Sequence, residues 1–512
     1  MRLPITDDNR RWWTLAAMCF ALFMVMLDNT VVNVALPAIQ RDLHMSISGL
    51  EWTINAYTLV LAVLLVTGGR LGDLFGRKRM FLFGVVVFAL ASAMIGFAQS
   101  EAWLVGFRAV QGIGAAFMMP GTLSIITHSF PAEERGKAIG TWAGVSALAL
   151  AIGPVLGGFL VEHVSWQSIF FINLPVAAFA IVLTLIAANE SRDEGVARTI
   201  DVPGVAAITI GLGALVFALV EGNQWGWGSA RILALFATAV IGLVGFVIIE
   251  RRSRAPMVDF TFFRSREFFG ANAVAFIVTF GMFAMFFFLA LYMQNVRDYT
   301  ALQAGVRFLP TTLLIIVTAP LAGRLSDRIG SKLPMVAGLL IVSGSLFWQS
   351  FLTTSSGYGF LVVPFMMMGV GMGLVMSPMS TAAMNAVPVT KAGVASGILS
   401  MTRMVGGTFG VAALGALITA LGRDRLGHLL PQAGSGQLDK LADALGAGAA
   451  PAGAPSSAMD DAFVHALQGG MRLGAAVVLV GAFVAAATIS SRRRVPANAG
   501  QGVDAAQTEL AA

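Results

Sequence analysis

Long apolar runs follow one another along the whole chain, separated by short polar or charged segments. The runs are continuous, whereas strands of a membrane β-barrel alternate between apolar and polar residues and are about half as long. A run of about 20 apolar residues can cross a bilayer as a helix. The pattern therefore predicts an all-α membrane protein with fourteen transmembrane helices, at Trp13–Ile39, Trp52–Gly68, Met80–Phe97, Trp103–Ile126, Ala138–Val161, Ile169–Ala188, Val205–Val220, Ile232–Ile249, Phe269–Met293, Phe308–Leu321, Leu333–Leu352, Phe360–Ala383, Gly393–Leu421 and Leu473–Ile489.

A charged segment after the second run has a close relative after the tenth. The first copy runs from Gly69 to Lys78 and the second from Gly323 to Lys332, and they share Gly, Arg, Leu, Asp, Gly and Lys at matching places. Such a repeat predicts two related halves. We expect an N-terminal six-helix bundle at 1–188 and a C-terminal six-helix bundle at 268–490. Residues 189–267 would hold polar linkers and an inserted pair, helices 7 and 8.

Two segments of the second half are expected to lie outside the membrane. Residues 422–470 are rich in Ala, Gly and Pro, which favours a long, mobile outer loop. Short helices at Leu438–Leu445 and Ala458–Leu467 are the alternative. The tail at 491–512 is expected in the cytoplasm, and its polar part after Pro496 is expected to be disordered.

Composition supports the membrane class and excludes others. The chain is 57% hydrophobic and 12% charged, whereas soluble proteins carry about 25% charged residues. The net charge of +6 does not predict nucleic-acid binding, because the basic residues lie in short loops and form no continuous patch. With one cysteine, Cys19, no disulfide can form within the chain and no metal-ligand spacing exists. We expect no metal, no cofactor and no enzymatic activity.

The placement of Lys and Arg predicts the orientation. Most of them fall in alternate loops, on the side shared by both termini. Because cytoplasmic loops carry the excess of basic residues, both termini are expected in the cytoplasm. We expect a multi-pass monomer in the cytoplasmic (inner) membrane, surrounded by the lipid bilayer.

Three ionisable residues fall within spans, where each costs about 2.5–3.5 kcal/mol and so needs a reason. Asp28 and Arg108 lie at comparable depth and are expected to face each other. Burial favours the neutral acid and the arginine favours its ionised form, so the pair suits a proton carrier. A static ion pair is the alternative. Arg403 has no acid at its depth, so it would meet an anionic group or water, or a polar network with Asn272 or Asn385.

Small and polar residues surround these charges. Thr30 and Asn33 supply hydrogen-bonding groups near Asp28, and Gln111 and Gly112 follow Arg108. In the fifth run, small residues four apart favour a close-packed helix face, and a proline permits a bend. The sequence is compatible with either a packing role or a gating role for these residues, which are Gly144, Gly153, Pro154, Gly157 and Gly158.

The residues of the charged repeat also predict particular backbone shapes and contacts. Gly69 and Gly76 allow close approach and a sharp reversal, and Asp73 could accept from the N-terminus of a facing helix or pair with Arg77. Simple anchoring by positive charge would explain Arg77 and Lys78, but it explains neither Asp73 nor its counterpart Asp327.

These motifs together resemble the major facilitator superfamily, and in particular its fourteen-span drug:proton antiporters. Gly69–Lys78 is similar to motif A, Arg108-x-x-Gln-Gly to motif B and Gly153-Pro154-x-x-Gly-Gly to the antiporter motif C. Leu27–Pro37 and Ser165–Pro175 resemble the first-helix and sixth-helix signatures, although Gln167 and Ser168 depart from the second.

The resemblance implies two bundles that rock about a central cavity and export small amphipathic drugs or antibiotics in exchange for protons. It implies proton coupling by Asp28 with Arg108, and a cytoplasmic latch containing Asp73 and Arg77. Cavity candidates are Thr30, Asn33, Asn173, Asn272, Phe283, Asn385 and Arg403, although the Phe/Met run around Phe283 could also face lipid or pack. An exporter of one endogenous metabolite or lipid, or a transport-inactive sensor, remain alternatives.

Overall fold

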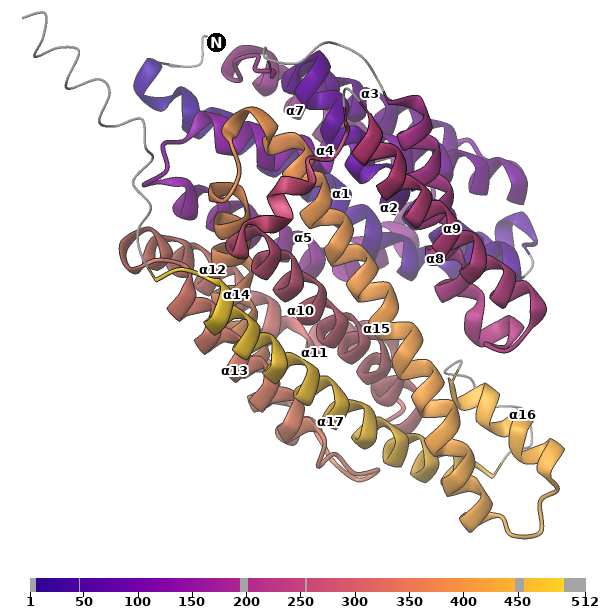
Figure 1. Cartoon of the computed structure of the whole chain (residues 1–512). Helices are drawn as coiled ribbons and strands as arrows, with labels where there is room; N and C mark the ends of the chain where they lie inside the picture. Colours follow the sequence, from indigo (N-terminus) through magenta and orange to yellow (C-terminus); the bar gives the residue numbers. More distant parts are fainter. Residues whose placement is uncertain (1–5, 46, 194–200, 254–255, 447–454, 492–512) are drawn as a thin grey trace, which may run out of the picture.

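The computed structural model describes residues 6–45, 47–193, 201–253, 256–446 and 455–491, whose path Figure 1 shows. In this part of the chain all regular structure is helical. Fourteen of its helices are long and apolar enough to cross a membrane, as the apolar runs predict. The segment 492–512 of the predicted tail lies outside the described residues.

The first half contains six spans. The sixth span is interrupted at Ile172, where α6 ends and α7 begins. The helices are α1 (Asp7–Leu43), α2 (Ile47–Phe75), α3 (Arg77–Gly96), α4 (Glu101–Ser129), α5 (Arg135–His163), α6 (Ser168–Phe171) and α7 (Asn173–Ala187).

The inserted pair and the second half follow. Several helices begin at a capping residue, because the first backbone N–H groups of a helix have no partner inside it; Asp201, Ser229 and Ser265 cap α8, α9 and α10. The elements are α8 (Val202–Trp225), α9 (Ala230–Arg252), the short 3-10 helix η1 (Phe260–Arg264), α10 (Arg266–Leu291), the π-helical turn η2 (Tyr292–Val296), α11 (Ala301–Arg307), α12 (Leu309–Ile329), α13 (Lys332–Gln349), α14 (Tyr358–Asn385), the 3-10 helix η3 (Val389–Lys391), α15 (Ala392–Leu429), α16 (Ser435–Gly446) and α17 (Ser456–Thr488).

Helices pack within each half, often against helices that are not their neighbours in sequence, and the halves then pack against each other across the middle of the molecule. In the first half α4 packs against α1, α2 and α3, and in the second half α14 packs against α12 and α13. The halves meet where α5 packs on α12 and where α2 and α4 pack on the long helix α15 (Figure 1). The pair α8–α9 packs on itself, and α8 also contacts α2 and α15. The domain boundaries drawn from the sequence stay a prediction.

The two halves touch closely at the end of the bundle that carries Asp73, which we call the Asp73 end. A Cβ atom placed on Gly69 would collide with the carbonyl of Gly393, and one on Gly136 would collide with the carbonyl of Gly323. Small residues allow helix backbones to approach in this way. The structure is therefore closed between its halves at the Asp73 end.

The charged segment at Gly69–Lys78 is mostly helical, and the expected sharp reversal is confined to one residue. Helix α2 continues to Phe75 and α3 starts at Arg77, so the chain reverses at Gly76 alone, with a φ of 113°. Only glycine adopts such a φ readily. The second copy does the same at Gly330, with a φ of 85°.

The mobile loop favoured at 422–470 is wrong for most of its length, and the alternative is confirmed, because Leu438–Leu445 lies within α16 (Ser435–Gly446) and Ala458–Leu467 lies within α17 (Ser456–Thr488). Helix α15 continues to Leu429, α16 follows, and α17 begins at Ser456, while residues 447–454 lie outside the described part. The reason is an apolar stripe on α16, where Leu441 and Leu445 are buried and Leu445 lies against Gly422 of α15. Burial of such a stripe stabilises the short helix, which the sequence left only as the alternative to a loop.

Candidate functional site

Asp28 of α1 and Arg108 of α4 meet inside the first half. The Nη1 atom of Arg108 donates to Oδ2 of Asp28 over 2.5 Å, and the two side chains are 1% and 0% exposed. The pairing expected from their depth is confirmed. Because both charges are removed from water, each depends on the other for compensation.

Polar neighbours complete the bonding of this pair. Gln111 accepts from Arg108 Nη1 over 2.6 Å and donates through Nε2 to Asp28 Oδ1 over 2.9 Å. Ser92 of α3 accepts from Gln111 over 2.8 Å and from Asn173 Nδ2 over 3.2 Å. The prediction that Asn173 lines a cavity is wrong, because it is 1% exposed and belongs to this buried network.

Helix α2 holds Arg108 from the other side. The carbonyl of Thr53 accepts from Arg108 Nε over 2.8 Å, and the guanidinium carbon lies 4.3 Å from the ring centre of Tyr57. Gly112 lets α4 approach the Tyr57 carbonyl closely. Sequence reasoning missed Tyr57 and Ser92, whose only signal was an isolated polar group within an apolar run.

Thr30 and Asn33 do not join the Asp28 network. The Thr30 hydroxyl donates to the carbonyl of Leu27 over 3.0 Å, and the Asn33 amide donates to the carbonyl of Asn29 over 2.9 Å. Both bonds stay within α1, as is common for short polar side chains in helices. Thr30 also lies against Gly153 of α5, so it supports packing between α1 and α5.

The glycines of motif C form close helix contacts. A Cβ on Gly157 would meet Val31 of α1, one on Gly158 would approach Val34, and one on Gly144 would meet Ile316 of α12. The backbone of Pro154 lies within α5, whereas its side chain is not among the parts that the structure describes. These residues therefore pack α5 against α1 on one stretch and against α12 on another.

A second buried charge cluster, the Asp73 junction, ties α2 to α15. Asp73 accepts from the backbone N–H groups of Gly393 and Val394, each over 2.9 Å, at the first turn of α15. Arg77 donates to Asp73 through Nη2 over 2.7 Å and to the carbonyl of Thr390 over 2.6 Å. Both partners expected for Asp73 are present. A carboxylate at a helix N-terminus gains from the unpaired N–H groups and the helix dipole.

The second copy of the repeat makes an equivalent contact, the Asp327 junction, between α12 and α5. Asp327 accepts from the N–H groups of Gly136 and Lys137, each over 2.9 Å, at the first turn of α5. Lys78 contributes differently, since its amine donates to the carbonyl of Ala188 over 2.8 Å, at the end of α7. The two acids thus close the Asp73 end symmetrically, each from one half onto a helix of the other.

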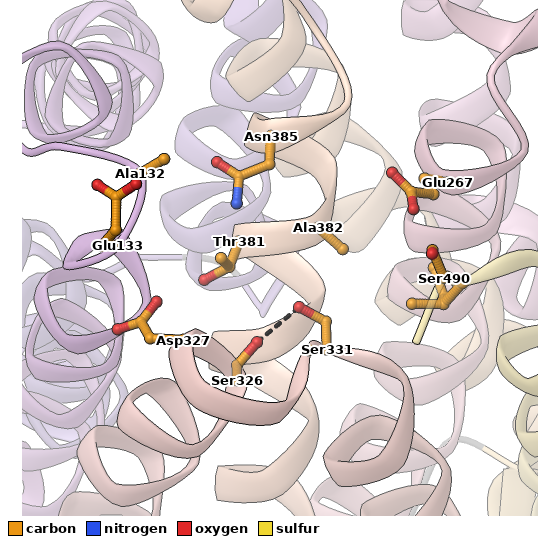
Figure 2. A pocket seen from close by; sticks show the side chains of 12 residues that line it. Ala132, Glu133, Glu267, Ser326, Asp327, Ser331, Thr381, Ala382, Asn385 and Ser490 are labelled. Carbon is orange, nitrogen blue, oxygen red and sulfur yellow. Dashed lines mark hydrogen bonds between the residues drawn. The ribbon is translucent and has the colours of Figure 1, made fainter. Parts of the chain in front are cut away.

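A small pocket adjoins the Asp327 junction (Figure 2). Its labelled residues include Asp327 and Glu133 on one side, Asn385 and Thr381 of α14, and Glu267 on the other side. Its volume is about 70 Å³, which is room for a few water molecules but well below the roughly 300 Å³ of a typical ligand pocket. In this closed arrangement the pocket is sized for water and not for a drug-sized molecule.

Arg403 does not form the polar network considered from the sequence. Among the described residues no hydrogen bond or ion pair reaches its side chain, which is half-buried in α15. Asn272 donates to the carbonyl of Phe268 over 2.9 Å, and Asn385 accepts from Arg135 over 3.0 Å at the Asp73 end. The network with Asn272 or Asn385 is therefore wrong, and Arg403 remains a membrane-embedded cation without a protein partner in the described part.

The hydrophobic candidate Phe283 is 49% exposed, and its ring lies against Gly407 of α15. On the same helix Met285 is fully buried and Phe280 is 8% exposed. The Phe/Met run of α10 thus has a packed face and an exposed face, and only the exposed face can contact lipid or substrate.

Fourteen spans, two halves that close on each other and a buried charge network define a membrane transporter. The family model of the Major Facilitator Superfamily matches residues 18–411. The chain belongs to this family of membrane transporters, which confirms the resemblance drawn from the motifs.

Relatives agree with that assignment. The chain is 36% identical over 495 residues to the tetracenomycin C resistance and export protein of Streptomyces glaucescens, covering 93% of this chain and 91% of that one. It is 40% identical over 408 residues to multidrug resistance protein Stp of Mycobacterium tuberculosis, covering 80% and 76%. The human organic anion transporter MFSD10 (TETRAN) shares the fold, with a TM-score of 0.60, 13% identity and coverage of 94% and 100%.

Proposed function

We propose that the protein exports amphipathic drugs or antibiotics in exchange for protons, by alternating access. The observation that carries the proposal is the sealed network of Asp28, Arg108, Gln111 and Asn173 inside a span bundle. A carboxylate at this depth is costly and typically serves a proton or substrate pathway. The names of the relatives support export of drugs or antibiotics as the overall activity.

Asp28 is the proton-carrying group in this proposal. When its carboxylate takes up a proton, Arg108 loses the charge that it pairs with and keeps the Thr53 carbonyl and the Tyr57 ring as partners. A cation–π contact is strongest in a site without water, so the ring can retain the guanidinium. The guanidinium then moves toward α2, and α1 moves relative to α4.

The Asp73 and Asp327 junctions act as latches of the closed end, which the orientation predicted from Lys and Arg places at the cytoplasm. While both carboxylates cap helices of the opposite half, substrate can leave only toward the other side. Opening the cytoplasmic end requires both caps to break.

The substrate would meet a cavity between the halves that includes Arg403 and the exposed face of α10 with Phe283. Large aromatic and Met side chains adapt to apolar ligands of different shape. An unpaired guanidinium favours substrates that present an acidic or electron-rich oxygen. Amphipathic compounds meet both requirements.

Inverted membrane vesicles test the proposal. An imposed proton gradient is followed by a fluorescent pH probe while tetracenomycin C or another amphipathic compound is added. The wild type should release protons when substrate is added, and Asp28→Asn should abolish that release. Asp443→Asn, at an exposed acid of α16, is the matched control and should behave as the wild type.

The outcomes separate the alternatives. Unchanged substrate-driven proton release in Asp28→Asn would remove Asp28 as the proton site. Response to one compound among many would favour a narrow exporter, and response to none would favour the sensor.

A further inference from the structure

The last turn of α9, in the inserted pair, buries a carboxylate that the proton network at Asp28 does not use. Glu250 is 3% exposed. Its Oε2 atom accepts from the backbone N–H of Val258 over 3.1 Å. Its Oε1 atom is buried and has no hydrogen-bond partner among the described residues. A buried carboxylate oxygen without a donor is rare and requires a physical explanation.

A second carboxylate lies beside it. Asp201 caps α8 by accepting from the N–H of Gly204 through Oδ1 over 2.8 Å, and its Oδ2 atom is buried without a hydrogen-bond partner in the described part. A Cβ atom placed on Gly204 would lie 2.8 Å from Glu250 Oε1 and 3.2 Å from Asp201 Oδ1. The two carboxylates therefore lie within roughly 6 Å of each other, the range in which like charges disfavour each other's ionised form.

One positive charge faces the pair from the first half. Arg70 of α2 is 6% exposed and interacts electrostatically with Glu250, but no ion pair joins them. Arg251 and Arg252 of α9 itself are exposed at the surface. The cluster of Asp201, Glu250 and Arg70 would carry one net negative charge if both acids were ionised.

We propose that Glu250 binds a proton and forms, with Asp201, a second proton-binding site located in the inserted helix pair. A proton on Oε1 turns an unpartnered acceptor into a donor for the neighbouring carboxylate and removes the repulsion between the two acids. Arg70 then balances the remaining charge of Asp201. This site is separate from Asp28 and does not depend on the proton coupling proposed there.

The Glu250 site connects the inserted pair to α2, the helix that carries Asp73. Arg70 lies less than one turn before Asp73 on α2. When Glu250 loses its proton, its new charge attracts Arg70 and draws α2 toward α9. Protonation of the inserted pair thereby changes the position of the helix that holds the Asp73 junction.

Infrared difference spectroscopy on the purified full-length protein tests the site, because a protonated carboxylic acid has a C=O band distinct from that of a carboxylate. Spectra are recorded across a pH titration in lipid nanodiscs. The wild type should show a titrating acid band that Glu250→Gln removes. Glu221→Gln, at another buried acid of the inserted pair, is the matched control and should keep that band. Asp28→Asn should keep it too, which separates this site from the proposed transport proton.

A second variant covers the case in which Glu250→Gln fails to fold. In Asp201→Asn the neighbouring negative charge is absent, so Glu250 should ionise more easily and the midpoint of its band should fall by about one pH unit. A wild-type spectrum that Glu250→Gln leaves unchanged, or a midpoint that Asp201→Asn does not move, would overturn the proposal.

Discussion

The guanidinium of Arg108 lies between the carboxylate of Asp28, 2.5 Å away, and the ring of Tyr57, whose centre is 4.3 Å away. One side chain of α4 therefore connects α1 with α2. At its other end α2 carries Asp73, which caps the first turn of α15. A change of charge at Asp28 therefore acts, through Arg108, on one end of α2. A change of charge at Asp73 acts on the other end of the same helix.

Removal of Arg108 should be strongly destabilising. Arg108→Ala leaves Asp28 buried without its counter-charge, and breaking a buried ion pair in this way typically costs about 3–5 kcal/mol. Thermal unfolding in detergent should show a large drop in the unfolding temperature. The double variant Asp28→Asn/Arg108→Ala should recover much of the loss, since neither charge then remains. Equal losses in the single and double variants would mean that packing, not charge, is responsible.

Weakening the Asp73 junction should open the closed end. Asp73→Asn loses the ion pair with Arg77 and one of its two strong acceptors for the α15 N-terminus. Ser396, fully buried one turn into α15, provides the reporter as Ser396→Cys. Labelling of this cysteine by a maleimide should rise severalfold when Asp73→Asn is added. The single native cysteine, Cys19, is buried and should contribute little labelling of its own. Unchanged labelling would show that Asp73 does not hold this end closed.

Removal of Arg403 should affect transport and not folding. Because no described residue compensates its charge, Arg403→Ala deletes a cation whose placement within a span costs about 2.5–3.5 kcal/mol. The unfolding temperature should stay the same or rise, whereas transport of acidic amphipathic compounds should fall. Arg403→Lys keeps the charge and is the control. A drop in stability as large as that of Arg108→Ala would reveal a partner.

The linker after α9 should show a small acid-dependent loss of stability. Partial burial raises the pKa of Asp259, but its hydrogen bonds with Lys391, over 2.7 Å, and with Thr261 outweigh this and lower the pKa below its usual value. A lowered pKa means that the stabilisation is present above the usual value of about 3.9 and is lost as pH falls through the lowered one. The effect should be below about 1 kcal/mol, because the pair is partly exposed. Unfolding curves of the wild type and Asp259→Asn should converge at acidic pH.

The sequence predicted the fold well because a bilayer permits few alternatives. Backbone groups in hydrocarbon must bond within the segment, so every long apolar run becomes a helix. The cost of burying a charge likewise made the pairing of Asp28 with Arg108 predictable from the sequence. Outside the membrane the sequence favoured the wrong alternative: it preferred a mobile loop where α16 forms, because the apolar stripe of α16 has a partner only once α15 is in place.

The amino-acid sequence by itself determined the class of protein, the number of spans, the repeated acids Asp73 and Asp327 and the presence of a costly charge pair. Only the tertiary structure decided which polar groups meet. It assigned Asn173 and Tyr57 to the Asp28 site, separated Arg403 from Asn272 and Asn385, and brought Glu250 beside Asp201. The physical reason is that helix periodicity fixes depth and face along one segment, whereas hydrogen bonds across segments depend on the packing and rotation of several helices at once.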